Sequence, residues 1–88
     1  MAAFAVITTA PNEALNTAIG NVYSSAHHRI SPTVCLVADT GVTTEEVCSK
    51  LGIQVGGISS TVVFKIESYY GLASKSIWEW LKVKGSEP

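Results

Sequence analysis

The sequence has few charged residues. They make up 15% of its 88 residues, against about 25% in average domains, while apolar residues make up 47%. The formal net charge is −1, with six Lys and Arg residues and no dense cationic cluster, so strong electrostatic binding of nucleic acid is not expected. A surface this poor in charge predicts that part of it is covered by a partner. A homodimer is the simplest such partner.

Cysteine and long apolar runs are also scarce. Two cysteines, Cys35 and Cys48, are too few for a disulfide scaffold, and we interpret them as small apolar core residues rather than a redox pair. No uncharged run reaches the roughly 20 apolar residues needed to span a bilayer. The N-terminal MAAFAVITTA has no positively charged region before its apolar stretch, so we interpret it as a strand and expect a cytoplasmic protein without membrane association.

The first half of the chain predicts a strand, a helix and a strand pair. Residues 3–9 are apolar on both faces and end before Pro11, as in a buried strand. A helix then begins at Pro11 and Asn12, and its apolar residues fall at helical spacing as far as Ala26. Residues 27–30 predict a short edge strand that pairs through a Ser-Pro turn with a strong strand at 33–39.

The second half predicts a helix, a strand and a last helix. Thr43 and Glu46 form a capping-box pattern before a helix that ends near Leu51, where Gly52 follows. The glycine-rich residues 52–57 lack the Lys and Ser/Thr of a phosphate-binding loop, and no cofactor is expected. Residues 61–67 alternate as a half-buried strand does, and Ser74 precedes a helix over 75–84.

This order predicts an α+β fold, a ferredoxin-like βαββαβ two-layer sandwich with an additional C-terminal helix. Both main helices would lie on one face of a four-stranded antiparallel sheet. The chain would form a single domain over residues 1–84, with a frayed tail at 85–88. If residues 27–30 are a loop instead, the result is a three-stranded α/β unit.

Three segments carry a resemblance to a known family. They are residues 33–40 with the Thr-Thr-Glu-Glu-Val that follows, the strand 62–67, and the Trp-Glu-Trp-Leu of residues 78–81. Together they resemble the small ferredoxin-fold proteins related to the CRISPR-associated endoribonuclease subunit, in particular bacterial members of that group. The resemblance covers roughly residues 33–81 and implies homodimers.

The same resemblance bears on catalysis. Some family members cleave RNA or double-stranded DNA with a metal held by an aspartate at the end of the first strand. Here that strand ends in Thr8, Thr9 and Ala10, and a hydroxyl is a poor substitute for a carboxylate on a hard cation. We therefore expect no metal site. A related family of antitoxins acts on RNA, which keeps that function open by analogy.

Two groups of polar residues are candidates for catalysis. His27, His28 and Arg29 form a local cluster of titratable groups suited to acid–base chemistry or phosphate contact, although a solvated edge strand is the stronger interpretation. Asp39, at the end of a strand, could hold a metal or water, but a turn or cap is favoured. No second carboxylate lies near Asp39 in sequence, although Glu67 also ends a strand and could approach it in space.

The aromatic residues near the C-terminus are candidates for an interface. Tyr69, Tyr70, Trp78 and Trp80 could stack on nucleic-acid bases, but acidic neighbours favour a dimer interface or a cover for the open sheet face. The sequence thus predicts a small non-catalytic homodimeric protein with a binding, accessory or regulatory role, whose further partner is a protein or a nucleic acid. The alternative is a diverged nuclease-like or antitoxin protein that acts on RNA or DNA.

Overall fold

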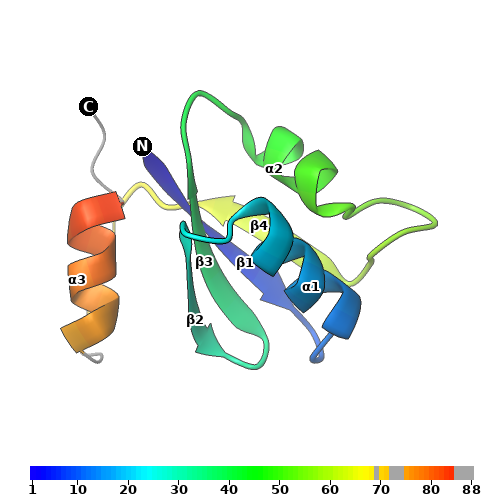
Figure 1. Ribbon diagram of the computed structural model, residues 1–88, viewed down its shortest axis with the longest axis horizontal. Helices are drawn as coiled ribbons and strands as arrows, with labels where there is room; N and C mark the ends of the chain where they lie inside the picture. Colours follow the sequence, from blue (N-terminus) through cyan, green and yellow to red (C-terminus); the bar gives the residue numbers. More distant parts are fainter. Residues whose placement is uncertain (69, 72–74, 85–88) are drawn as a thin grey trace.

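The computed structural model describes residues 1–68, 70–71 and 75–84, which form an α+β domain. Four strands and three helices follow one another along these residues (Figure 1). They are β1 (Ala2–Thr8), α1 (Glu13–Val22), β2 (His27–Ser31), β3 (Val34–Asp39), α2 (Thr44–Leu51), β4 (Thr61–Lys65) and α3 (Lys75–Lys84). The predicted element order is confirmed, including the short strand at residue 27. The predicted cap Ser74 and the predicted frayed tail lie outside the described residues.

The strands form one sheet in the order β2-β3-β1-β4, and every neighbouring pair is antiparallel. β1 is central because its residues are apolar on both faces, as the sequence predicts. In the register, Val6 lies between Cys35 of β3 and Val63 of β4. Residues directly opposite one another in a sheet share a face, so this register decides which side chains enter which layer.

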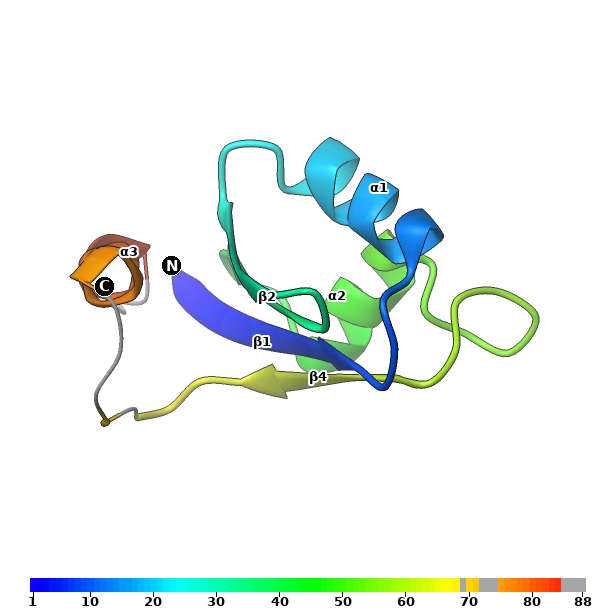
Figure 2. The same ribbon diagram turned by 90° about the horizontal axis from the view of Figure 1, so that it is seen from below.

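Helices α1 and α2 both lie on one face of the sheet, as predicted (Figure 2). The main core forms between this face and the two helices. Its buried members are Ala2, Phe4, Val6, Leu15, Ile19, Tyr23, Cys35, Val37, Val47 and Leu51. Cys35 is a buried, unpaired member of this core, as predicted, whereas Cys48 is unpaired but only half-buried and is not among the buried core residues; burial raises the pKa of both thiols.

Helix α3 packs on the opposite face, which we call the outer face. Ala3, Leu36 and Leu81 are buried there, and Ile77, Trp78 and Trp80 pack against them. The helix contacts β1 and β2 and lies at one end of the sheet, as Figures 1 and 2 both show. Among the described helices, α3 alone packs on the outer face, and it does so at that end.

Helix α1 is shorter than predicted. The Asn12 side chain caps its start by accepting from the backbone N–H of Leu15 at 3.0 Å, as an N-cap residue should. The helix ends at Val22 rather than near Ala26, because the chain turns at Tyr23 to enter β2. Tyr23, the residue after the helix, is buried, whereas Val22 is exposed, so the chain leaves the helical spacing before Ala26.

Strand β4 buries a different face from the one its alternation suggests. Val62 and Phe64 are 52% and 55% exposed, whereas Val63 packs against the main core. The register explains this, because Val63 lies opposite Val6, and Val6 points toward α1 and α2. Val62 and Phe64 of β4 therefore lie on the outer face, beyond the part that α3 covers.

Candidate functional site

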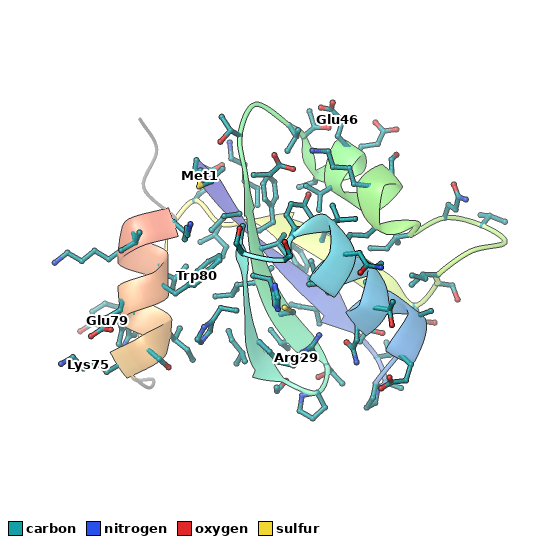
Figure 3. All side chains as sticks on the ribbon, in the orientation of Figure 1. Met1, Arg29, Glu46, Lys75, Glu79 and Trp80 are labelled. Atoms are coloured by element: carbon teal, nitrogen blue, oxygen red, sulfur yellow. The ribbon has the colours of Figure 1, made fainter. Side chains whose placement is uncertain are left out.

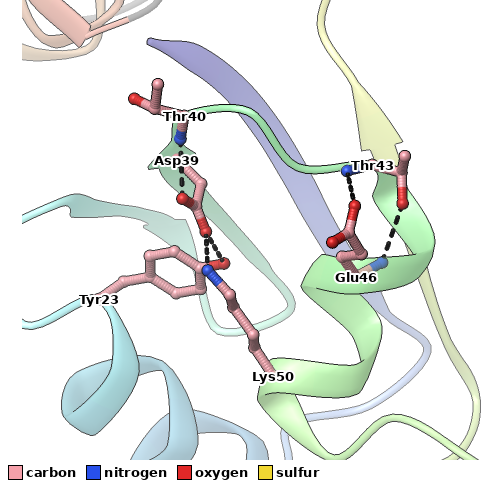
Figure 4. A network of polar contacts seen from close by, with 6 residues as sticks. All are labelled: Tyr23, Asp39, Thr40, Thr43, Glu46 and Lys50. Carbon is pink, nitrogen blue, oxygen red and sulfur yellow. Dashed lines mark hydrogen bonds and ion pairs between the residues drawn. The ribbon is translucent and has the colours of Figure 1, made fainter.

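Asp39, the predicted candidate at the end of β3, is the centre of a polar network (Figure 4). Its Oδ2 accepts a hydrogen bond from the Tyr23 hydroxyl at 2.8 Å and an ion-paired contact from Lys50 Nζ at 2.7 Å. Its Oδ1 accepts from the backbone N–H of Thr40 at 2.7 Å. The carboxylate thus joins the end of β3 to the C-terminal end of α1 and to α2.

The network holds Asp39 ionised and Tyr23 protonated. Burial acts to raise the pKa of Asp39, but the hydrogen bonds from Lys50, Tyr23 and Thr40, with the charge of Lys50, bring it below its ordinary value. Burial, and then the hydrogen bond and charge of Asp39, raise the pKa of Tyr23 far above its ordinary value. A phenol that resists ionisation is a poor general base, and a carboxylate with both oxygens engaged is a poor metal ligand. This geometry supports a structural role for Asp39.

The predicted capping box lies at the start of α2. Glu46 N donates to Thr43 Oγ1 at 3.2 Å, and Thr43 N donates to Glu46 Oε1 at 2.9 Å (Figure 4). The prediction from sequence is confirmed. Glu45 and Glu46 both occupy the first turn of this helix, so its N-terminus carries negative side chains and is not suited to an anion.

The cluster of His27, His28 and Arg29 does not converge on one point. His27 lies opposite Val37 on the helix-covered face, and its Nδ1 is 2.6 Å from the Tyr23 carbonyl oxygen. His28 lies opposite Leu36 on the outer face, with its ring centroid 6.2 Å from that of Trp80. The two imidazoles therefore point to opposite faces, as expected for neighbours in a strand.

Arg29 is held by neighbouring oxygens rather than left free for phosphate. Its Nη1 donates to the Ser31 carbonyl at 2.9 Å, and its Nη2 donates to Asn16 Oδ1 at 2.6 Å. Figure 3 shows Arg29 near the β2–β3 end of the sheet, away from α3. The hydrogen-bond partners of Asp39 are Tyr23, Thr40 and Lys50, so neither histidine nor Arg29 joins it in a common site.

A metal centre does not form among the residues that the structure describes. No three His, Cys, Asp or Glu side chains of these residues gather closely enough to hold an ion. Glu67, the predicted second carboxylate, pairs with Lys65 at 3.9 Å, whereas Asp39 pairs with Lys50. The two carboxylates are thus bound to different cations.

An open hollow of about 380 Å³ lies beside the start of β1 and the β3–α2 loop. It is lined by Met1, Ala2, Thr40, Gly41, Val42, Thr43 and Lys65. Neither Asp39 nor a histidine lines it. The backbone N–H groups of Thr40 and Thr43 already donate to carboxylates of this chain. Lys65 is the one charged side chain among the lining residues of the hollow, and no carboxylate, histidine or cysteine lies beside it there.

The aromatic candidates lie in different surroundings. Trp78 and Trp80 are half-buried and pack against the outer-face cluster, while Tyr70 is fully exposed; Tyr69 lies outside the described residues. Figure 3 shows Trp80 projecting from α3 toward the sheet, with Lys75 and Glu79 on the far side of the helix. Lys75 and Glu79 form an exposed ion pair at 3.7 Å. The two tryptophans thus cover part of their own sheet.

An apolar surface remains on the outer face where α3 does not reach. We call Ile7, Val62 and Phe64 the outer-face patch; Ile7 lies opposite Val62, and Phe64 is the next residue along β4 on the same face. Ile7 is 38% exposed, and the other two are more than half exposed. The alternation in the sequence identifies the apolar residues of β4, but only the strand register shows that Val62 and Phe64 lie in solvent.

A scan against protein-family models and searches of curated proteins and of solved structures found no match. Each helix in the described part of the chain falls short of the length and hydropathy that a membrane-spanning helix needs.

Proposed function

We infer that the domain is a ferredoxin-like βαββαβ sandwich with an added C-terminal helix. The element order and the sheet order β2-β3-β1-β4 support this assignment. The kinship with proteins related to the CRISPR-associated endoribonuclease subunit stays a hypothesis based on short sequence segments. Folds of this kind carry many unrelated functions, so function is argued from the surface and the sites.

We propose that the protein is a homodimeric, non-catalytic binding protein that acts as an accessory or regulatory subunit. The observation that carries this proposal is the outer-face patch, whose large apolar side chains are exposed to solvent. Helix α3 packs on the same face but leaves these side chains exposed. Contiguous exposed apolar surface of this kind is typical of interaction sites. None of the three patch residues is charged, which favours a protein partner over a nucleic acid.

The catalytic alternative is less well supported. It requires that His27, His28, Arg29 and Asp39 act together on RNA or DNA, yet the histidines point to opposite faces and Asp39 is engaged by three donors. The contacts of His27, His28 and Arg29 are those expected of an edge strand, and the contacts of Asp39 are those of a residue that links β3 to the helices. The proposal therefore assigns them structural roles.

Two measurements test the proposed function. Light scattering after size-exclusion chromatography should give twice the monomer mass of 9.3 kDa. Labelled RNA and DNA, incubated with the pure protein and Mg²⁺, Mn²⁺ or EDTA, should show no metal-dependent cleavage. Cleavage that Asp39→Asn abolishes, while Glu67→Gln retains it, would reject the non-catalytic assignment. A monomer at high concentration would reject the homodimer.

A further inference from the structure

The two edges of the sheet differ in how well they are protected. On β2 the register with β3 shifts between Arg29 and Ser31, and α3 packs against this strand. Bulges, charges and a covering helix are common means of preventing further strand pairing. β4 is the other edge, and its pairing with β1 runs over all five residues without a shift. No other described strand pairs with its free side.

The backbone groups that face this free side follow from the hydrogen bonds to β1. Ile66 N donates to the Ala3 carbonyl at 2.9 Å, and Thr9 N donates to the Ser60 carbonyl at 3.1 Å. Bonding alternates along an antiparallel pair, so the even-numbered residues of β4 direct their N–H and C=O groups to β1. The groups of Thr61, Val63 and Lys65 therefore point away from the sheet.

We propose that two copies of this chain pair through β4 as antiparallel neighbours, with Val63 opposite Val63 and Thr61 opposite Lys65. This register brings all three outward-facing residues of each strand into hydrogen-bonded pairs with those of the other, so the two sheets become one of eight strands. Registers shifted by two residues leave one of the three without a strand partner. A larger shift in one direction sets Lys65 opposite Lys65, which is unfavourable.

The same register is complementary in its side chains. Val62 of each copy lies opposite Phe64 of the other on the outer face, and aromatic–β-branched pairs of this kind stabilise sheets. The symmetry axis is perpendicular to the joined sheet, so both outer faces stay on one side. The two outer-face patches then meet across the axis. This inference rests on the proposed function, because it specifies how the homodimer forms and how its binding surface becomes continuous.

Proline at position 63 tests the pairing. Its missing N–H is one that points outward, so Val63→Pro keeps the hydrogen bonds to β1, and proline is tolerated on edge strands. Val63→Ala is the control, since it also alters the side chain that packs against the core but keeps the N–H group. Val63→Pro should weaken dimerisation at least roughly tenfold relative to Val63→Ala, because two central hydrogen bonds are lost. Sedimentation equilibrium measures both constants, and circular dichroism checks the fold.

A charge pair tests the register. Thr61→Glu sets a carboxylate opposite Lys65 of the other copy, whereas Thr61→Lys sets two cations opposite each other; both lose the same hydrogen bond from Thr61 to the Ser59 carbonyl. The Glu variant should dimerise roughly fivefold more tightly than the Lys variant. If the wild type dimerises and Val63→Pro matches Val63→Ala, pairing through β4 is wrong while the homodimer stands. Equal constants for the two Thr61 variants would reject this register, and a monomeric wild type would reject both proposals.

Discussion

At the scale of single residues, Asp39 shows how a candidate catalytic group can be a structural one. A hydroxyl, an ammonium and a backbone N–H all donate to it, and they come from the C-cap residue of α1, from α2 and from the loop after β3. Such hydrogen bonds to a charged group are each stronger than those between neutral groups. The residue therefore ties three segments together at the point where β3 leaves the sheet.

Asp39→Asn should lower the free energy of unfolding by about 1–3 kcal/mol, because the neutral amide loses the Lys50 pairing and places a donor beside other donors. Urea denaturation at pH 7 measures the change. Glu67→Gln is the matched control, since its 3.9 Å pair with Lys65 is mostly exposed and should contribute less than about 1 kcal/mol. A loss for Asp39→Asn no larger than for the control would contradict the anchoring role.

At the scale of elements, α2 is encoded almost entirely by its own neighbours in sequence. The capping box holds its first turn, and Gly52 ends it in a left-handed conformation with φ of 78°. Other residue types adopt that conformation at a cost, whereas glycine does so freely. Both boundaries of this helix could therefore be predicted before its tertiary contacts were known.

Thr43→Ala should reduce the free energy of unfolding by about 1 kcal/mol, because a backbone N–H at the start of α2 loses its acceptor. Thermal and urea denaturation both report this. Ser49→Ala, at an exposed position of the same helix, should leave stability within about 0.5 kcal/mol of the wild type. Comparable losses for the two variants would show that the box does not stabilise the helix.

At the scale of the whole molecule, stability should depend on pH through the network at Asp39. Its pKa is lower in the folded than in the unfolded chain, so its contribution is complete above the unfolded value of about 3.9 and is lost as pH falls through the folded value. The stability difference between wild type and Asp39→Asn should therefore shrink as pH falls from 6 toward 2. Urea denaturation across that range measures it, and a difference that stays constant would refute the linkage.

Much of the fold was predictable, since capping, periodicity and turn residues act over a few positions. The apolar β1, the edge strand from His27 and the start of α2 follow from such local signals. The end of α1 was predicted too late, because Ala26 continues the helical spacing while the chain already turns at Tyr23. A periodic pattern cannot distinguish a helix from the segment that leaves it on the same side.

The sequence by itself determined which segments are strands and helices, because hydrogen bonds between near neighbours and the spacing of apolar residues decide that. Only the tertiary structure decided what each face meets. It placed Val63 rather than Phe64 against the core, and it engaged Asp39 with donors from elements far along the chain. Those outcomes depend on strand register and on which helix packs where, which no local pattern contains.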